Sequence, residues 1–360
     1  MKSYTIGVLP GDGIGPEVTR EGLKVLDFVS KMYGFNLEKQ TYPYSGAYYL
    51  KTKELVPDRV IDEWRTLDAI LLGAIGHPDV TPGLVERSVI LGLRFGLDLY
   101  INLRPVKLYA EHLCPIKGKK PEDIDMLVVR ENTEGFYSQI GGHLKIDTAD
   151  EVALVSGVYT RKCCERAIRY AFDVAQQRSA SKSDSSPRVT LVDKANALQP
   201  HSIWTRTYAQ VAKDFPNIEQ DHAYVDAACM WMIKNPEWFD VIVTSNMFGD
   251  IITDLGAMIQ GGMGIAASGN IHPGQTSMFE PIHGSAPKHA GKNSASPIGA
   301  ILAVAMMLDF LGENLAAQQI EEAVSELLKS KQIPSVDTRS GISTDQVGSM
   351  VIKQLQSKDL

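Results

Sequence analysis

One pattern recurs in three stretches of the chain: VVREN at residues 128–132, LVDKAN at 191–196 and IVTSNMFGDIITD at 242–254. In each stretch an apolar, largely β-branched run ends abruptly in charged or amide residues. This change is typical of a buried parallel strand at its carboxyl end, where ligands of open α/β sheets bind. The sequence therefore predicts an arginine, a lysine and a pair of acids at one sheet edge, where they would suit a metal-bound, multiply anionic small molecule.

Strands and helices alternate along the chain. Strands are expected over residues 4–9, 69–72, 125–129, 189–192 and 241–244. A helix is expected to open at Pro16, a residue suited to the first helical position, and an amphipathic helix is expected over residues 160–178. The alternation predicts an α/β architecture. The serine-rich segment 179–187 is interpreted as a mobile surface loop rather than a domain boundary.

Composition excludes several classes of protein. With 360 residues, 44% of them hydrophobic, the chain is long enough for about two domains. A net charge of −7 argues against a nucleic-acid partner. The longest apolar run, residues 298–308, is too short to span a membrane. The cysteines show no CxxC spacing, so reduced thiols and a cytoplasmic location are expected. They are Cys114, Cys163, Cys164 and Cys229.

The glycine-rich turn GDGIGP at residues 11–16 is not a Rossmann fingerprint, because Pro16 stands where that motif needs glycine or alanine. Two interpretations remain. The turn could offer backbone N–H groups to an anion at a helix N-terminus, or it could simply connect a strand to a helix. The second is favoured when the turn is considered alone.

Two acids four residues apart, Asp250 and Asp254, share one face of a predicted helix. Carboxylates so placed suit Mg²⁺ or Mn²⁺. The alternative is a solvated helix start with favourable dipole charges, but the position just beyond a strand end favours the metal. Asp226 is a third acid in an apolar setting, for which a metal ligand and a helix N-cap are equally good interpretations.

Arg94, Arg104 and Arg130 are candidates for binding carboxylates, which a planar guanidinium does well. Surface arginines are the alternative, but Arg104 and Arg130 each follow an apolar stretch and are expected at the ends of elements. Lys194, at a strand end, is a candidate general base. Tyr137 lies in a loop-like segment, where it could deliver a proton or simply pack as an aromatic residue.

Taken together, six motifs resemble the β-decarboxylating dehydrogenases, which include isocitrate, 3-isopropylmalate, homoisocitrate and tartrate/D-malate dehydrogenases. The motifs are GDGIGPE at 11–17, NLRP at 102–105, VRENTEG at 129–135, DKAN at 193–196, NMFGD at 246–250 and EPIHGSAP at 280–287. The resemblance implies a two-domain fold that is not Rossmann, with the active site in the cleft between domains. One domain would comprise residues 1–102 and 263–360, and the central one, residues 103–262, would carry the dimer interface.

The resemblance also implies a role for each site residue. The three arginines would hold substrate carboxylates, and Asp226, Asp250 and Asp254 would hold Mg²⁺ or Mn²⁺. Lys194 would take the hydroxyl proton and Tyr137 would protonate the product enol. In the implied homodimer, Lys194 and Asp226 would reach the active site of the partner subunit. Hydride would leave C2 of the substrate for a nicotinamide, and the β-keto acid would lose CO₂.

The segment before Arg94 is where this family chooses its substrate. Val89, Ile90 and Leu91 supply an apolar wall, whereas isocitrate dehydrogenases place a polar amide at the position of Ile90. Ser88 resembles isocitrate dehydrogenases but cannot alone hold a third carboxylate. The expected substrate is a 3-substituted malate, 3-isopropylmalate first or one with a bulkier alkyl or benzyl group, which places the enzyme in leucine or related amino-acid biosynthesis. The alternatives are tartrate, D-malate or isocitrate, or a non-catalytic regulatory subunit.

The expected cofactor is NADP or NAD, with a slight preference for NADP. NAD-using members carry an aspartate after the motif 283–287, whereas this chain has Lys288 and His289, and a lysine would attract a 2′-phosphate. Ser296 replaces the usual asparagine near the adenine. The other expected cofactor contacts are Ile14, Gly73, Ala74, His283, Gly284, Ser285 and Ala286.

Overall fold

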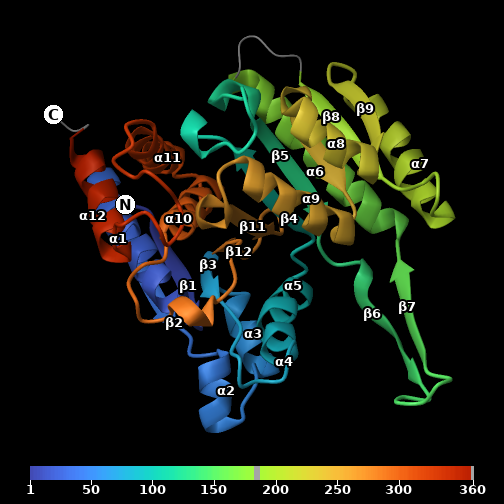
Figure 1. Ribbon diagram of the computed structural model, residues 1–360, viewed down its shortest axis with the longest axis horizontal. Helices are drawn as coiled ribbons and strands as arrows, with labels where there is room; N and C mark the ends of the chain where they lie inside the picture. The colour runs from blue at the N-terminus through green and yellow to red at the C-terminus, as the bar shows by residue number, and fades with distance from the viewer. Residues whose placement is uncertain (182–186, 358–360) are drawn as a thin grey trace. The chain divides into compact units, whose positions relative to one another are not determined.

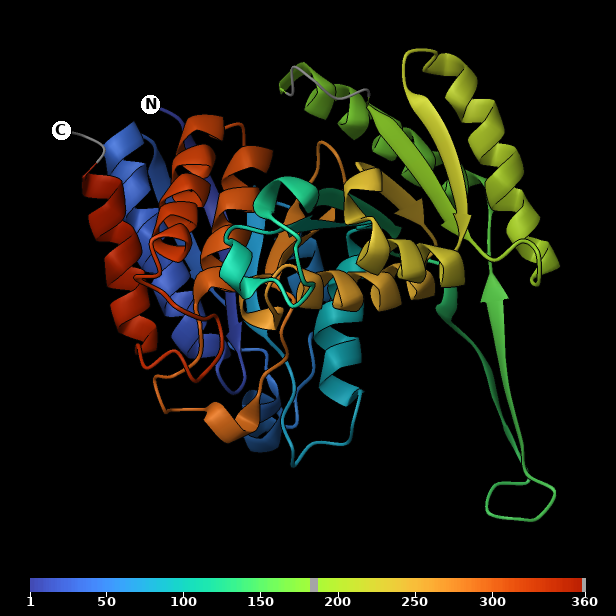
Figure 2. The same ribbon diagram turned by 45° about the horizontal axis from the view of Figure 1, so that its top comes forward.

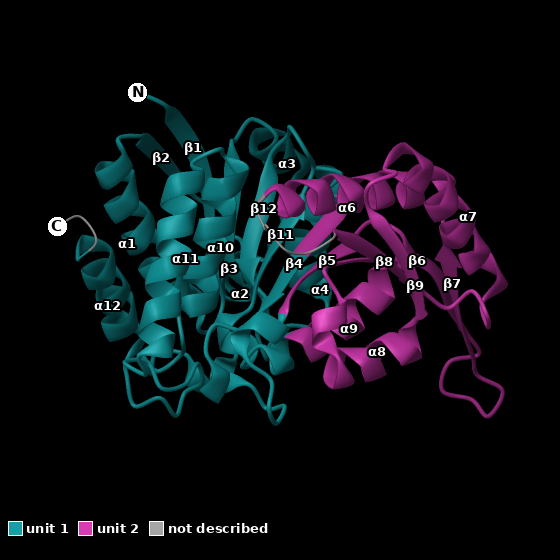
Figure 3. Cartoon of the chain, turned by 90° about the horizontal axis from the view of Figure 1, so that it is seen from above, with its two compact units in different colours: residues 1–99, 104–124, 257–360 teal, residues 100–103, 125–256 magenta. Residues whose placement is uncertain are grey.

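The computed structural model describes residues 1–181 and 187–357 (Figure 1). The chain forms two compact units (Figure 3): unit 1 comprises residues 1–99, 104–124 and 257–360, and unit 2 comprises residues 100–103 and 125–256. Both units combine strands and helices, which confirms the predicted α/β class. The division differs from the predicted one at three places: residues 100–102 belong to unit 2, and residues 104–124 and 257–262 belong to unit 1 rather than to the central part.

Segment 104–124 joins unit 1 through side-chain packing. Tyr109 and Ala110 are buried in the largest hydrophobic core of unit 1. The backbone N–H of Lys107 donates to Gln260 Oε1 at 2.9 Å, and the Lys107 ammonium pairs with Glu321. These contacts join residues far apart in the sequence, so local periodicity does not reveal them.

Unit 1 is built on a largely parallel sheet. Its strand order is β2-β1-β3-β12-β11, in which β11 alone is antiparallel to its neighbour. The carboxyl ends of β1, β3 and β12 therefore emerge at one edge. The strands are β1 (Ser3–Gly11), β2 (Asn36–Thr41), β3 (Ala69–Ala74), β11 (Ala267–Ile271) and β12 (Ser277–Pro281). Another strand, β4 (Ile101–Lys107), begins in unit 2 and ends in unit 1.

Hydrophobic cores lie on both faces of the unit 1 sheet. Ala69 and Leu71 of β3 belong to one core, whereas Ile70 and Leu72 belong to another, as expected for a strand buried on both sides. The first core is covered by α1 (Gly15–Tyr33), α10 (Ile298–Phe310), α11 (Asn314–Lys329) and α12 (Thr344–Gln356). Four shorter helices contribute residues to the second core or pack against it: α2 (Gly46–Thr52), α3 (Asp58–Trp64), α4 (Leu84–Glu86) and α5 (Gly92–Gly96).

Unit 2 has a fully parallel sheet and a separate antiparallel ribbon. The sheet order is β5-β10-β8-β9, with β5 (Asp125–Glu131), β8 (Arg188–Asp193), β9 (Glu219–Tyr224) and β10 (Val241–Thr244). Its helices are α6 (Arg161–Ser181), α7 (Ser202–Val211), α8 (Val225–Lys234) and α9 (Asn246–Ile259). The strands β6 (Gly135–Leu144) and β7 (Val152–Val158) pair only with each other and extend from the rest of the unit (Figure 2).

Several local predictions can be compared with these elements. The five expected strands coincide with β1, β3, β5, β8 and β10. The serine-rich segment is helical at its start, because α6 continues to Ser181, and its residues 182–186 lie outside the described part of the chain. The four cysteines are free thiols. Within residues 1–181 and 187–357, no helix is long and apolar enough to cross a membrane.

Candidate active site

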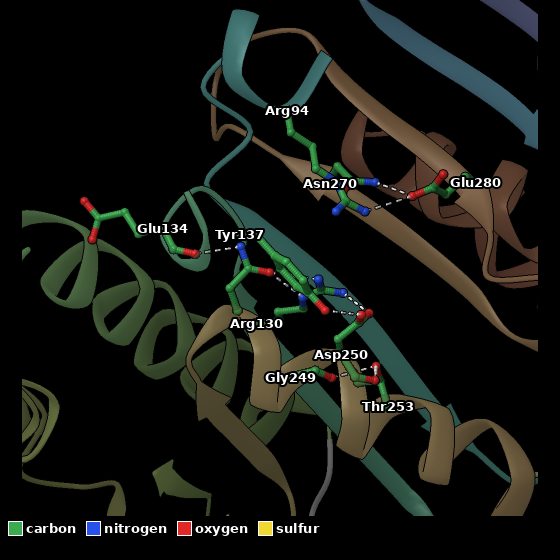
Figure 4. A network of polar contacts seen from close by, with 10 residues as sticks. Arg94, Arg130, Glu134, Tyr137, Gly249, Asp250, Thr253, Asn270 and Glu280 are labelled. Carbon is green, nitrogen blue, oxygen red and sulfur yellow. Dashed lines mark hydrogen bonds and ion pairs between the residues drawn. The ribbon is translucent and has the colours of Figure 1, made fainter. Parts of the chain in front are cut away.

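Arg130 is a fixed, buried cation at the carboxyl end of β5. Only 1% of the Arg130 surface is exposed to solvent. Its Nε and Nη2 both donate to Asn246 Oδ1, at 3.1 and 2.8 Å, and Asn246 Nδ2 donates to the carbonyl oxygen of Glu134 at 3.0 Å (Figure 4). Asn246 begins α9, two residues after the end of β10, and β10 is the neighbour of β5 in the sheet. The residue that follows one strand therefore orients the guanidinium carried by the next strand.

Asp250 connects Arg130 to Tyr137. Its Oδ1 accepts a hydrogen bond from Arg130 Nη1, and its Oδ2 accepts one from the Tyr137 hydroxyl at 3.0 Å (Figure 4). The guanidinium carbon of Arg130 lies 5.8 Å from the centre of the Tyr137 ring, within range of a cation–π contact. Tyr137 lies on β6, so the prediction of a loop at this position was wrong. The strand sequence, GFYSQIGGHL, contains three glycines and no regular alternation of apolar and polar residues, so it is a weak strand pattern.

Helix α9 directs its acids away from the core. Asp250 and Asp254 lie on the same side of the helix as the exposed Ile251, while Phe248 and Ile252 are buried. The prediction that both carboxylates share a face of one helix is therefore confirmed. The α9 backbone lies so close to Arg130 that a Cβ atom at Gly249 would stand 2.5 Å from Arg130 Cγ. The glycine of NMFGD thus has a packing role that the sequence alone did not reveal.

Lys194 and Asp226 form a second charged group in unit 2. Lys194 directly follows β8, as predicted, and its Nζ donates to Asp226 Oδ1. This hydrogen bond lowers the pKa of the Asp226 carboxyl. Asp226 lies inside the first turn of α8, whose N-cap is Tyr224. The N-cap interpretation of Asp226 is therefore wrong.

The aspartates suit a hard divalent cation, but they do not form a complete cluster within one chain. Among the described residues, no group of three or more His, Cys, Asp or Glu side chains could hold a metal. Asp250 and Asp254 offer carboxylate oxygens from one helix face, the donor type that Mg²⁺ and Mn²⁺ prefer. Asp226 of the same chain is engaged by Lys194 instead.

Arg94 of α5 has its own polar support in unit 1. Its Nε donates to Asn270 Oδ1 at 3.1 Å, its Nη2 lies 3.8 Å from Glu280 Oε1, and Asn270 Nδ2 donates to the same Glu280 oxygen at 2.8 Å (Figure 4). The sequence pattern does not reveal Asn270, which lies on the short β11, or a partner role for Glu280, which is part of the EPIHGSAP motif. Arg104 is buried in the middle of β4, so its predicted place at the end of an element was wrong.

The predicted specificity segment contains a π-helical turn, Arg87–Leu91, between α4 and α5. Such turns occur frequently at functional sites. Ser88 Oγ accepts a hydrogen bond from the backbone N–H of Val56 at 2.9 Å, and Val89 is buried in the second core of unit 1. Ile90 and Leu91 keep part of their surface exposed. Of the three apolar residues, these two are therefore available to a ligand.

The glycine-rich turn is used to assemble unit 1. The backbone N–H of Asp12 donates to Ala74 O at 2.7 Å, and that of Ile14 donates to Ser285 O at 2.8 Å. Gly13 has a φ of +60°, and a Cβ atom there would lie 1.9 Å from Ser285 O. Because protein carbonyls accept these bonds, the structure favours a connection over an anion-binding loop.

Three other residues expected to contact the cofactor, Ile14, Gly73 and Ser296, each make close contacts within the protein. Ile14 packs with Ala286 in a small core, and a Cβ atom at Gly73 would lie 2.3 Å from the Pro10 carbonyl oxygen. Ser296 Oγ donates to Gly264 O at 3.2 Å.

The EPIHGSAP motif and the two residues after it differ in exposure. Burial lowers the pKa of His283, whose Nδ1 donates to the carbonyl oxygen of Gly284 at 3.1 Å. Gly284 and Lys288 are exposed, and His289 is half-buried. Lys288 lies in a short 3₁₀-helix, Pro287–His289. The ammonium of Lys288 is therefore available to solvent or to an anion.

Sequence comparison agrees with this arrangement. A profile described as "Isocitrate/isopropylmalate dehydrogenase" matches residues 5–351. The chain is 46% identical over 358 residues to a 3-isopropylmalate dehydrogenase of Thermobifida fusca, covering 98% of both chains. It is 45% identical over 356 residues to the 3-isopropylmalate dehydrogenase of Corynebacterium glutamicum strain R, covering 98% of this chain and 99% of the other.

Solved structures of similar fold agree as well. An isocitrate dehydrogenase from Methylococcus capsulatus has a TM-score of 0.86 and 35% identity, covering 98% of this chain and 99% of that one. A β-decarboxylating dehydrogenase from Thermococcus kodakarensis has a TM-score of 0.79 and 33% identity, covering 98% and 96%. The chain belongs to the isocitrate/isopropylmalate dehydrogenase family. It is an oxidoreductase, a β-decarboxylating dehydrogenase that acts on a small molecule.

Proposed function

We propose that this enzyme catalyses the oxidative decarboxylation of 3-isopropylmalate, a step of leucine biosynthesis. The relatives with about 45% identity carry that name, and they match nearly the whole chain. The observation that supports the proposal is the Arg130–Asp250–Tyr137 network, in which hydrogen bonds join a guanidinium, a carboxylate and a phenol. These are the groups that we propose to bind a substrate carboxylate, hold the metal and deliver a proton. The partly exposed Ile90 and Leu91 favour an apolar 3-substituent over the third carboxylate of isocitrate.

In the proposed reaction the arginines bind the substrate, while Lys194 and Tyr137 transfer protons. Arg94, Arg104 and Arg130 bind the two substrate carboxylates. Lys194 takes the proton of the 2-hydroxyl group as hydride leaves C2, and Tyr137 returns a proton to C3 of the enol after CO₂ has left. Asp226, Asp250 and Asp254 would hold a divalent cation, which would supply Lewis acidity to the reaction. A bound nicotinamide supplies the hydride acceptor.

The enzyme is further proposed to work as a homodimer. Helices α8 and α9 expose apolar side chains that water solvates poorly, among them Met230 at 72% and Trp231 at 45% exposed, together with Ile251. The β6–β7 ribbon exposes Ile140 and Leu154, and an isolated two-stranded ribbon is marginally stable by itself. A second copy of the chain would cover these surfaces.

A homodimer would also complete the catalytic groups. Within one chain Lys194 pairs with Asp226, whereas Tyr137 pairs with Asp250. We infer that each active site combines Tyr137, Asp250 and Asp254 of one subunit with Lys194 and Asp226 of the partner subunit. This arrangement would supply the third carboxylate that the described residues of one chain do not bring to the pair on α9.

For the cofactor, we propose NADP rather than NAD. Lys288 directly follows the EPIHGSAP motif and is exposed in a 3₁₀-helix that begins at the last residue of that motif, where its ammonium could pair with a 2′-phosphate. The neighbouring His289 offers a second nitrogen donor. The four free thiols are consistent with a cytoplasmic enzyme.

Initial rates of reduced-cofactor formation test the proposed function. The substrates are 3-isopropylmalate, 3-benzylmalate, D-malate, tartrate and isocitrate, each with Mg²⁺ or Mn²⁺ and with NAD or NADP. We expect 3-isopropylmalate to give the highest kcat/KM, and chelation of the metal to stop the reaction. A higher kcat/KM with isocitrate or tartrate would overturn the assignment made from Ile90 and Leu91.

A further inference from the structure

The surroundings of Lys194 contain a buried acid with no role in the mechanism above. Asp193 immediately precedes Lys194 and is only 1% exposed. Its Oδ1 accepts two hydrogen bonds, from the backbone N–H of Ala195 at 3.0 Å and from His222 Nε2 at 3.1 Å. The first bond closes a local turn whose central residue is Lys194, and the second reaches the neighbouring strand.

His222 connects this turn to the start of α8. It lies on β9, whose parallel register pairs Leu191 with His222 and Asp193 with Tyr224. The imidazole packs edge to face on the Tyr224 ring, with 5.1 Å between ring centres and 84° between planes. Tyr224 is the N-cap residue of α8. The imidazole thus contacts both the residue before Lys194 and the N-cap residue of the helix that carries Asp226.

We propose that the Asp193–His222 pair is a positioning device that holds Lys194 against Asp226. Lys194 and Asp226 follow the carboxyl ends of two adjacent strands, and a small change in the spacing or turn at these ends would move the ammonium relative to the carboxylate. Lysine is a long, flexible side chain, so its place depends on the backbone that carries it. Neither member of the pair has a role at the substrate in the proposed reaction, so both are positioning residues. The effect on turnover rests on the proposed function, because Lys194 is the base in that reaction.

A matched pair of variants isolates the hydrogen bond. Glutamine and methionine have similar length, but only glutamine can donate an N–H to Asp193. The His222 side chain is 37% exposed, so both residues can be accommodated at the surface of β9. His222→Phe is a third variant that keeps an aromatic ring against Tyr224 while removing the donor. Gln220→Met, at an exposed position two residues earlier on the same strand, is the control.

The first measurement is the rate at which an acetylating reagent modifies Lys194, read by mass spectrometry of the peptide. We expect His222→Met and His222→Phe to raise this rate several-fold, because Lys194 is released from Asp226. His222→Gln should restore the wild-type rate, and Gln220→Met should leave it unchanged. Equal Lys194 reactivity in the wild type, His222→Met and His222→Phe would overturn the proposal.

The second measurement separates positioning from general stability. We expect His222→Met to lower kcat by about tenfold or more with KM and Tm nearly unchanged, and His222→Gln to recover most of kcat. A fall in Tm that Gln does not reverse, with unchanged Lys194 reactivity, would mean that the pair only stabilises the fold. If wild-type enzyme fails to oxidise 3-isopropylmalate, the proposed function fails, but the acetylation rates still decide whether the pair positions Lys194.

Discussion

The hydroxyl of Tyr137 donates to Asp250 Oδ2 at 3.0 Å, while the other oxygen of the same carboxylate accepts from Arg130. The proton proposed to reach the product enol is thus held beside an acid and a buried cation. Removing the Tyr137 hydroxyl group should slow protonation of the enol, whereas substrate binding should be retained. Tyr137→Phe is therefore expected to lower kcat about 10²-fold with little change in KM. Steady-state rates with 3-isopropylmalate check this, with Tyr48→Phe as control, because the hydroxyl of the half-buried Tyr48 also donates to a carboxylate, that of Glu54, at 2.8 Å. An unchanged kcat would remove Tyr137 from the mechanism.

Asp250 is expected to be essential for metal binding. Asp250→Asn keeps the shape of the side chain but removes a charge that a divalent cation requires. We expect metal-dependent turnover to be lost and Mn²⁺ affinity, measured by calorimetry, to fall strongly, with circular dichroism unchanged. Asp58→Asn, an exposed acid in the first turn of α3, is the control. Normal Mn²⁺ binding by Asp250→Asn would overturn the metal assignment.

Gly249 tests how tightly α9 packs on Arg130. In Gly249→Ala the new Cβ atom would stand 2.5 Å from Arg130 Cγ, so either the helix or the guanidinium must move. We expect a loss of stability of about 1–3 kcal/mol, seen as a lower Tm, together with a raised KM for substrate. Gly92→Ala is the matched control, because the nearest atom to its Cβ is 3.9 Å away. Equal Tm values for the two variants would show that the contact is easily relaxed.

The parts of the fold that could be predicted from the sequence are those in which consecutive residues are apolar and buried. Strand β10 has four buried residues and coincides with its predicted range. Strand β9 was missed because its residues, EQDHAY, are polar and partly exposed at a sheet edge. Local pattern also cannot show that Val89 is fully buried in a core while Ile90 packs against the same core only partly buried, because both lie in a π-helical turn.

The candidate site shows the same limit. Arg130, Lys194 and Asp250 could be found because each lies close to the carboxyl end of a buried strand: Arg130 near the end of β5, Lys194 directly after β8 and Asp250 on the helix that follows β10. Asn246 and Asn270, which orient Arg130 and Arg94, are neutral amides whose partners lie 116 and 176 residues away. A short-range pattern contains no information about such contacts. Their roles therefore became visible only when the strands carrying them were placed in three dimensions.

Lys288 is expected to select the cofactor. In Lys288→Asp an acceptor for ribose hydroxyls replaces a cation that would pair with the 2′-phosphate. We expect the ratio of kcat/KM for NADP to that for NAD to fall by about tenfold or more, because one charge-assisted contact is lost and a repulsive one is introduced. Lys292→Asp, another exposed lysine four residues later, controls for the change in net charge. An unchanged ratio would mean that Lys288 does not contact the cofactor.

Mixed dimers test whether active sites are shared between subunits. Tyr137→Phe and Lys194→Ala each remove one catalytic group, and each homodimer of a single variant should be nearly inactive. If Lys194 acts in the site of the partner subunit, a dimer with one chain of each kind has one site lacking both groups and one site with both intact. We therefore expect unfolding and refolding the two variants together to recover activity, up to half that of wild type per mixed dimer. Light scattering should show a dimer before and after. Separately refolded variants, mixed afterwards, are the control. No recovery in a verified mixed dimer would mean that both groups act in the subunit that carries them.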